Sequence, residues 1–112
     1  MGPPSSVQRP GPPGGSVAPV PYFVATYQYT ADTDTRDTVR PTHREWLGDL
    51  GETLVISGPT DADGAFLVFE AADAQAVRTV LEEDPFALQG GIIAETTVVG
   101  WTPVLGRLRD SF

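Results

Sequence analysis

The stretch Thr53-Leu-Val-Ile-Ser-Gly-Pro-Thr-Asp-Ala-Asp-Gly-Ala-Phe-Leu-Val-Phe69 lies in the middle of the chain and decides the fold. Its two ends, residues 53–57 and 65–69, are rich in β-branched and aromatic side chains, which is typical of strands. Residues 58–64 between them contain the Asp63-Gly64 pair that tight hairpins favour. The stretch therefore predicts two antiparallel strands joined by a turn.

The region before this hairpin predicts a strand followed by a helix. Residues 22–29 are aromatic and β-branched and predict the strand, and the polar residues 32–37 predict a turn after it. Apolar and aromatic side chains and one histidine then recur every three or four positions, which predicts an amphipathic helix of about three turns. These residues are Val39, His43, Trp46, Leu47 and Leu50. We expect Pro41 in the first turn, because an interior proline removes a helical hydrogen bond, and Gly51 at the end.

The region after the hairpin predicts a second helix and a last strand. Asp73 is a candidate N-cap, and Asp84-Pro85 ends the helix because the residue before a proline is disfavoured in helical geometry. The expected buried stripe is Ala74, Val77, Val80 and Leu81. Residues 92–104 predict a long final strand. The order is βαββαβ, an α+β, ferredoxin-like fold with one antiparallel sheet and two helices on one face.

The composition changes once, near residue 21. Residues 1–21 contain seven of the eleven prolines and four of the twelve glycines. Such a segment has too little apolar surface to offset the entropy of ordering it. We therefore predict a flexible tail over residues 1–21, a folded domain over residues 22–105 and a short C-terminal tail over residues 106–112.

The charge of the chain limits its partners. Fifteen acidic and seven basic side chains among 112 residues give a formal net charge of −8. This charge repels a phosphate backbone and an anionic membrane surface, so we expect neither a nucleic acid nor a membrane partner. No apolar run approaches the ~20 residues of a membrane-spanning helix, and the N-terminus lacks the apolar core of a signal peptide, which favours the cytoplasm.

The residue inventory also limits the chemistry. The chain has one histidine and no cysteine, which excludes thiol enzymes, disulfide scaffolds and the ligand sets of structural zinc and iron–sulfur sites. Gly90-Gly91 has no phosphate-binding or dinucleotide context and predicts a turn. We therefore expect no metal and no cofactor.

The sheet face without helices predicts an oligomer. Alternation along the predicted strands places Tyr, Ile, Val and Trp side chains on this face, and an apolar patch of that size is unusual on a monomer. The same face of a second copy is its simplest cover. We predict a homodimer through the sheet face, with room for a small molecule between the two sheets.

His43 is the natural centre of any proton transfer, because an imidazole exchanges protons near neutral pH. Val39 and Leu47, four residues away on each side, place it on the inward stripe of the predicted helix, where it is either a core histidine or a catalytic one. Asp84 is the candidate partner that accepts its second N–H. Asp-Pro is also the pattern of a helix N-cap, so this alternative for Asp84 stays open.

Two further residues are candidates for the wall of a binding site. Ser57 ends a predicted strand and offers a hydroxyl donor, and Gly58 permits close approach of the backbone. The chain has no nucleophile elbow of the type Gly-x-Ser-x-Gly, so we do not expect a hydrolase triad.

Three other side chains are candidates for contacts with a substrate. Arg40 precedes His43 by three residues and can pair with an anionic group of a substrate, or with a carboxylate such as Asp37. Tyr27 and Trp101 are candidate pocket walls. Aromatic residues on strands also form cores and dimer interfaces, so that alternative remains for both.

Six short motifs follow one another along the chain. They are Tyr22-Phe-Val, Val39-Arg-Pro-Thr-His43, Leu54-Val-Ile-Ser-Gly-Pro59, Phe66-Leu-Val-Phe-Glu70, Asp84-Pro-Phe86 and the closing strand into Trp101 and Pro103. Together the series resembles the YciI-like (YCII-related) family of the dimeric α/β-barrel superfamily, over about residues 22–105. The resemblance implies a ferredoxin-like subunit that dimerises through its sheets. It also implies a cleft in which His43 and Asp84 act as a pair, with Ser57 and Gly58 at its wall.

The residues and the resemblance together predict a cofactor-independent enzyme that acts on a small metabolite in the dimer cleft. In this hypothesis His43 transfers a proton and Asp84 fixes its tautomer, which suits a lyase, dehydratase, cyclase or isomerase. The alternative is a non-catalytic dimeric module that binds a ligand or a partner. A His43 that is sealed from solvent, or paired only with backbone, would favour this alternative.

Overall fold

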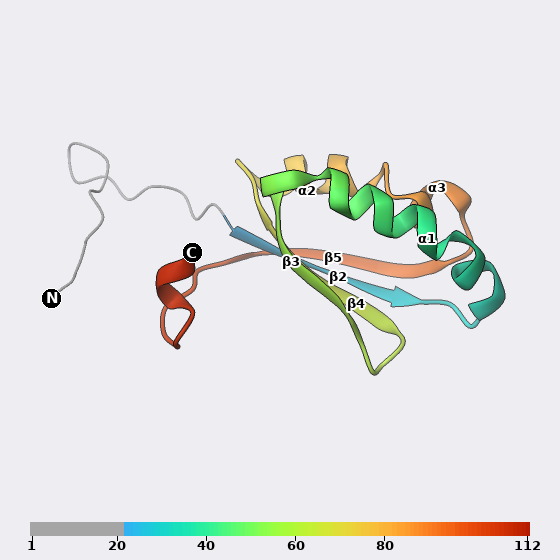
Figure 1. The fold of residues 1–112 in the computed structure, drawn as a ribbon, viewed down its shortest axis with the longest axis horizontal. Coiled ribbons are helices and arrows are strands. Elements are labelled where there is room, and N and C mark those ends of the chain that lie inside the picture. The colour runs from blue at the N-terminus through green and yellow to red at the C-terminus, as the bar shows by residue number, and fades with distance from the viewer. Residues whose placement is uncertain (1–21) are drawn as a thin grey trace, which may run out of the picture.

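Four strands and three helices form two layers in the computed structural model, which describes residues 22–112. The antiparallel sheet has the strand order β3-β4-β2-β5, and all helices lie over one of its faces (Figure 1). The strands are β2 (Tyr22–Tyr29), β3 (Leu54–Thr60), β4 (Gly64–Glu70) and β5 (Ile93–Trp101). The helices are α1 (Thr33–Asp49), α2 (Ala74–Leu81) and α3 (Pro85–Gln89). The predicted α+β ferredoxin-like fold is confirmed; the tail predicted over residues 1–21 lies outside the described residues.

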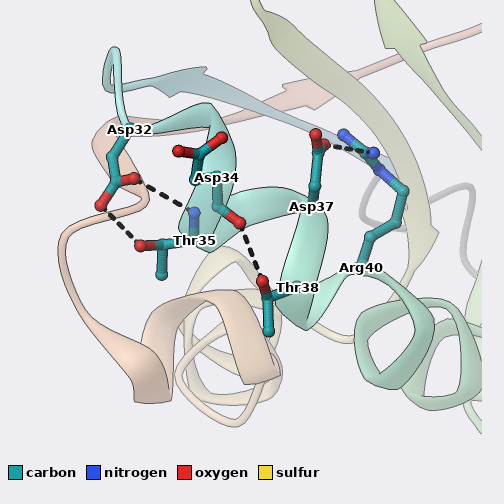
Figure 2. A network of polar contacts seen from close by, with 6 residues as sticks. All are labelled: Asp32, Asp34, Thr35, Asp37, Thr38 and Arg40. Atoms are coloured by element: carbon teal, nitrogen blue, oxygen red, sulfur yellow. Dashed lines mark hydrogen bonds and ion pairs between the residues drawn. The ribbon is translucent and has the colours of Figure 1, made fainter.

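Helix α1 begins earlier than the sequence predicts, so the turn predicted over residues 32–37 is wrong. Asp32 is the N-cap, and its carboxylate accepts hydrogen bonds from the backbone N–H of Thr35 (3.1 Å) and from the Thr35 hydroxyl (2.7 Å) (Figure 2). These two bonds lower the pKa of Asp32 below its ordinary value. The cap satisfies donors that would otherwise be unpaired, which compensates for the polar composition of the first turns.

Pro41 lies in the interior of α1 and not in its first turn, contrary to the prediction. A proline there lacks the N–H that would bond the carbonyl of Asp37 and costs about 3 kcal/mol in an isolated helix. Both halves of α1 pack against the rest of the molecule. Arg36 lies over the Tyr29 ring before the proline, and Leu47 and neighbouring residues pack on the core after it. Tertiary packing therefore outweighs the local preference.

The ends of the strands differ from the prediction by a few residues. β3 continues to Thr60, so the hairpin turn shortens to residues 61–63, where Asp63 adopts a left-handed backbone with φ 55°. β5 ends at Trp101, short of the predicted Val104, because Pro103 has no N–H to extend the ladder. Asp73 caps α2 as predicted and accepts a bond of 2.8 Å from the Ala76 N–H.

The two faces of the sheet have different environments. Side chains on the helix-covered face, among them Ala25, Tyr27, Leu67 and Phe69, form the core together with Val77 of α2. The opposite, open face leaves large apolar side chains exposed, among them Ile56 (59% exposed), Phe66 (47%) and Val99 (57%). The buried polar side chains of residues 22–112, His43 and Asp84, lie on the helix side of the sheet.

The segment after β5 returns to the end of the sheet. It contains a short 3₁₀ helix (Arg109–Ser111), and the ring of Phe112 meets Tyr22 and Trp101 edge-on, with 5.2 Å between centroids in both pairs. The domain boundary at residue 105 stays a prediction. Among residues 22–112, no helix combines the length and apolarity needed to cross a membrane.

We expect Gly64→Ala to lower the free energy of unfolding by about 1–3 kcal/mol, because a Cβ at this position would collide with the backbone carbonyl oxygen of Tyr27. Gly58→Ala is the matched control, since a Cβ there meets nothing within 4 Å. Urea unfolding of both variants measures the difference. Equal stabilities would contradict the close approach of β2 and β4 at this point.

Candidate functional site

His43 is held by aromatic rings on the inner side of α1. Its imidazole stacks on the Phe86 ring of α3 with 3.9 Å between centroids and an angle of 5°. Trp46, one turn further along α1, lies 6.1 Å away on the same helix. Only 8% of His43 is exposed. The stack fixes the plane of the imidazole, so the directions of its two nitrogens are set by packing.

Asp84 is fully buried, and three donors surround its carboxylate. Oδ1 lies 2.7 Å from Nδ1 of His43 and accepts a second bond of 2.9 Å from the Phe86 N–H. Oδ2 accepts a bond of 2.6 Å from the Tyr27 hydroxyl. The same oxygen of Asp84 therefore caps α3 and lies against the histidine.

The electrostatics around Asp84 decide which atoms carry protons. Burial, followed by the charge of Asp84, raises the pKa of Tyr27 well above its ordinary value, so its hydroxyl stays a donor. The same two causes raise the pKa of Tyr29. A carboxylate offers only acceptor atoms, so the His43 tautomer that fits the contact with Asp84 carries its proton on Nδ1. Nε2 is then the basic nitrogen, and within residues 22–112 no group hydrogen-bonds to it.

A cavity of about 390 Å³ opens beside His43, on the helix side of the sheet. It is lined by Tyr29, Arg40, His43, Arg44, Leu47, Ser57, Gly58, Pro59, Ala65, Leu67 and Phe86. These residues come from β2, α1, β3, β4 and α3 of a single chain. The volume falls within the ~300–1,000 Å³ that is usual for small-molecule sites.

The structure brings most of the predicted site residues together. Arg40, Ser57 and Gly58 line the cavity with His43. Arg40 also forms an ion pair of 2.6 Å with Asp37, one turn earlier on α1 (Figure 2). Asp84 lies behind the histidine, so it acts on the cavity only through the imidazole.

Two predicted pocket walls lie elsewhere. Tyr27 is 3% exposed and faces Asp84, where it holds the carboxylate and does not line this cavity. Trp101 pairs with Tyr22 at the far end of β2 and contacts Phe112. It is absent from the residues around His43 because β5 places it on the open face.

Sequence reasoning missed three features of the site. The stacking of Phe86 on His43 depends on α3, a helix of five residues that no periodicity reveals. The bond from Tyr27 to Asp84 joins positions 57 residues apart. The third feature, Arg44 in the cavity wall, could have been predicted from the sequence. It follows Arg40 by one helical turn and therefore lies on the same face of α1.

This arrangement is suited to proton transfer. A carboxylate that accepts from one imidazole nitrogen fixes the tautomer and stabilises the imidazolium that forms when the other nitrogen takes a proton. Here His43 lines the cavity, and its imidazole is stacked on the Phe86 ring. The geometry provides a general base or acid with access to a bound molecule.

Comparison with known proteins gives a family match over most of the chain. The model of the YCII-related domain matches residues 20–102. None of the curated proteins compared with the chain matches it significantly.

Solved structures with the same fold include one enzyme with related sequence. The 5-chloro-2-hydroxyhydroquinone dehydrochlorinase of Burkholderia phenoliruptrix AC1100, in complex with 2,5-dihydroxybenzoquinone, is 26% identical with a TM-score of 0.64, and the match covers 71% of this chain and 92% of that one. A candidate antibiotic biosynthesis monooxygenase from Bacteroides thetaiotaomicron VPI-5482 is 10% identical with a TM-score of 0.50, covering 78% and 91%. The second match shows the shared fold alone.

We expect the buried tyrosine to limit stability at alkaline pH. An exposed tyrosine in the unfolded chain ionises near its ordinary value of 10.0, whereas folded Tyr27 keeps its proton. Unfolding above that pH therefore releases a proton, and stability falls by up to ~1.4 kcal/mol per pH unit as pH rises.

In Tyr27→Phe this loss is absent, so the fall of stability with alkaline pH is shallower than in the wild type. The raised pKa of Tyr29 acts in both proteins and cancels in the comparison. Urea unfolding at a series of pH values from neutral to about 11 measures both slopes. Parallel slopes would show that Tyr27 is not held in its neutral form.

Proposed function

The chain belongs to the YCII-related domain family, and we propose that it is an enzyme that performs proton-transfer chemistry on a small molecule without a cofactor. The observation that supports this most is the His43–Asp84 pair, joined at 2.7 Å beside a cavity of about 390 Å³. Burying a carboxylate destabilises the fold unless hydrogen bonds replace the lost hydration. Asp84 is fully buried, and three hydrogen-bonding groups surround its carboxylate.

The proposed chemistry is an elimination or an isomerisation that starts at Nε2 of His43. Nε2 takes a proton from the bound molecule, and the electron pair left behind forms a new double bond. In an elimination, the leaving group departs with its bonding pair; in an isomerisation, the proton returns at another atom. Asp84 stabilises the imidazolium in either case, and no oxidant or reductant is needed.

The related dehydrochlorinase favours the elimination among these reactions. It is a lyase of the same fold with 26% identity, and its structure holds a small quinone. We therefore propose a lyase-type reaction on a ring compound of similar size, bound in the cavity beside His43. Arg40, Ser57 and Gly58 are proposed to contact this compound, because all three line the cavity.

The alternative, a module that only binds a ligand or partner, receives less support from this geometry. That alternative predicts a histidine sealed from solvent or paired only with backbone. Instead His43 pairs with a carboxylate and lines a cavity. A histidine oriented by a buried carboxylate is the arrangement that general acid–base catalysis uses.

We also propose that the chain forms a homodimer through its open sheet face. Ile56, Phe66 and Val99 are 47–59% exposed on this face, although each is large and apolar. Ile56 and Phe66 lie on the paired strands β3 and β4, and Val99 lies on β5, which is separated from β4 by β2. The same face of a second copy covers them without exposing new apolar surface.

The enzyme proposal predicts that His43→Gln lowers kcat at least ~10²-fold without loss of the fold, because it removes the basic nitrogen and keeps a similar volume. Chloride release from 5-chloro-2-hydroxyhydroquinone, followed with the purified protein, is the first assay. Asp84→Asn should also lose activity, since an amide no longer stabilises the imidazolium. Glu45→Gln, on an exposed position of α1 outside the cavity, is the control.

A measurement that needs no substrate accompanies this assay. ¹⁵N NMR of His43 should show the neutral ring protonated at Nδ1, and addition of 2,5-dihydroxybenzoquinone should shift the Nε2 signal. A ring protonated at Nε2 would contradict the proposed role of Asp84. Full turnover by His43→Gln would exclude His43 as the base.

The dimer proposal predicts that Phe66→Glu yields a folded monomer. A charge at the centre of an apolar interface stays unpaired and prevents association. Light scattering coupled to size-exclusion chromatography measures the mass, and Leu88→Glu, an exposed position on α3, is the control that should leave the dimer intact. A monomeric wild-type chain would refute the proposal.

A further inference from the structure

One side of α1 carries three arginines at successive helical turns. Arg36, Arg40 and Arg44 are spaced four residues apart, and residues with this spacing lie on one side of a helix. His43 lies between the last two on the helix surface. Arg40, His43 and Arg44 all line the cavity of about 390 Å³. Positive groups are therefore concentrated beside the proposed base.

This concentration is unusual for the chain as a whole. The formal net charge is −8, with fifteen acidic side chains and only seven basic ones. No Asp or Glu belongs to the cavity wall, which contains two arginines and one histidine as its only ionisable groups besides Tyr29. Asp84 is separated from the cavity by the imidazole to which it is bonded. The cavity is thus a locally cationic site in an acidic protein.

The three arginines differ in how far they are already paired. Arg40 uses one guanidinium nitrogen, Nη1, for Asp37, which leaves its other donors for a ligand. Arg44 is exposed and makes no ion pair or hydrogen bond with any residue in the range 22–112. Its free, planar fork is the donor set that best matches a carboxylate or another anionic oxygen.

Arg36 adds positive charge beside Tyr29, a residue of the cavity wall. Its guanidinium lies 4.6 Å from the centroid of the Tyr29 ring, whose other neighbours include the cavity wall. Nε and Nη1 of Arg36 are buried without a hydrogen-bond partner among the described residues. Among residues 22–112 no carboxylate forms an ion pair with Arg36, so its positive charge is not directly compensated beside Tyr29.

The rest of the cavity wall suits a flat, apolar ring. Leu47, Pro59, Leu67 and Phe86 line it, and Phe86 presents the same aromatic group that stacks on His43. The volume matches a single ring with a few substituents, and aromatic faces favour offset stacking with such rings. A ring bound here lies between the apolar wall and the arginines.

From this juxtaposition of Arg40, Arg44 and His43 in one cavity, we infer that the substrate is a single-ring compound bearing an anionic oxygen, a carboxylate or an ionised hydroxyl. Arg44, with Arg40, binds the anionic oxygen and positions the ring against His43. The inference rests on the proposed proton transfer and specifies its substrate class. The arginines also stabilise the negative charge that develops on the ring when Nε2 removes a proton.

The test compares ligands of equal shape and different charge. Benzoate and 4-nitrophenolate carry the two kinds of anionic oxygen, and benzamide is the neutral counterpart of benzoate. We expect NMR titration of the wild-type protein to show at least one anion binding about tenfold more tightly than benzamide, with shifts at His43. The tighter of the two anions identifies whether a carboxylate or an ionised hydroxyl is preferred.

Substitution of the arginine tests the assignment. Arg44→Gln should weaken binding of the preferred anion about tenfold, equivalent to ~1.4 kcal/mol, and leave benzamide unchanged. Arg78→Gln, an exposed position on α2 away from the cavity, is the matched control and should bind as the wild type does. Equal binding of anions and benzamide, no binding of either anion, or unchanged binding in Arg44→Gln overturns the inference.

The two proposals fail in different ways. Binding depends on the arginines and not on the basic nitrogen, so His43→Gln should still bind the preferred anion. Selective anion binding with full turnover by His43→Gln would support the substrate class and refute the base. Conversely, turnover that requires His43 but is unchanged by the charge on the ring and by Arg44→Gln would support His43 as the base and refute the substrate class.

Discussion

The hydrogen bonds that end on the buried carboxylate of Asp84 hold the functional side of the molecule together. One comes from Tyr27 on the central strand β2, one from His43 on α1 and one from the first turn of α3. A buried charge without partners destabilises a fold by several kcal/mol, so all three elements must keep their positions at once. The site is therefore also a structural junction, and its geometry is rigid for the same reason that the fold is stable.

The sequence predicted the fold because its apolar periodicities are regular, and it failed where one polar group or one distant contact decides. The order of elements followed from alternation and from the Asp63-Gly64 turn. The start of α1 was missed because the six residues after its N-cap, Asp32, are all polar and show no apolar periodicity. Pro41 is tolerated inside the helix because both halves of α1 pack against the rest of the molecule. His43 and Asp84 were predicted as a pair and lie 2.7 Å apart. No local pattern could show that Tyr27 would be the third member.

The inner strand β2 contributes side chains to both faces of the sheet. Residues of β2 that point to the helices belong to the core and to the carboxylate junction, and the next residues along the chain point to the open face. The cavity beside His43 lies wholly on the helix side, within one chain. A partner on the open face thus touches the site only through the backbone of the sheet. Under the two proposals, a substitution on the open face would alter association without touching the side chains of the cavity.

The cationic cavity in an acidic chain has a consequence for the speed of ligand encounter. At long range an anionic molecule meets the field of a net charge of −8, which slows its approach in dilute salt. Salt screens that repulsion over the ~8 Å Debye length of physiological solutions, whereas contact with Arg40 and Arg44 is screened much less. Moderate ionic strength therefore accelerates association while it weakens the bound state only slightly. Anions are therefore attracted only by short-range contact with the arginines and not by the long-range field of the protein.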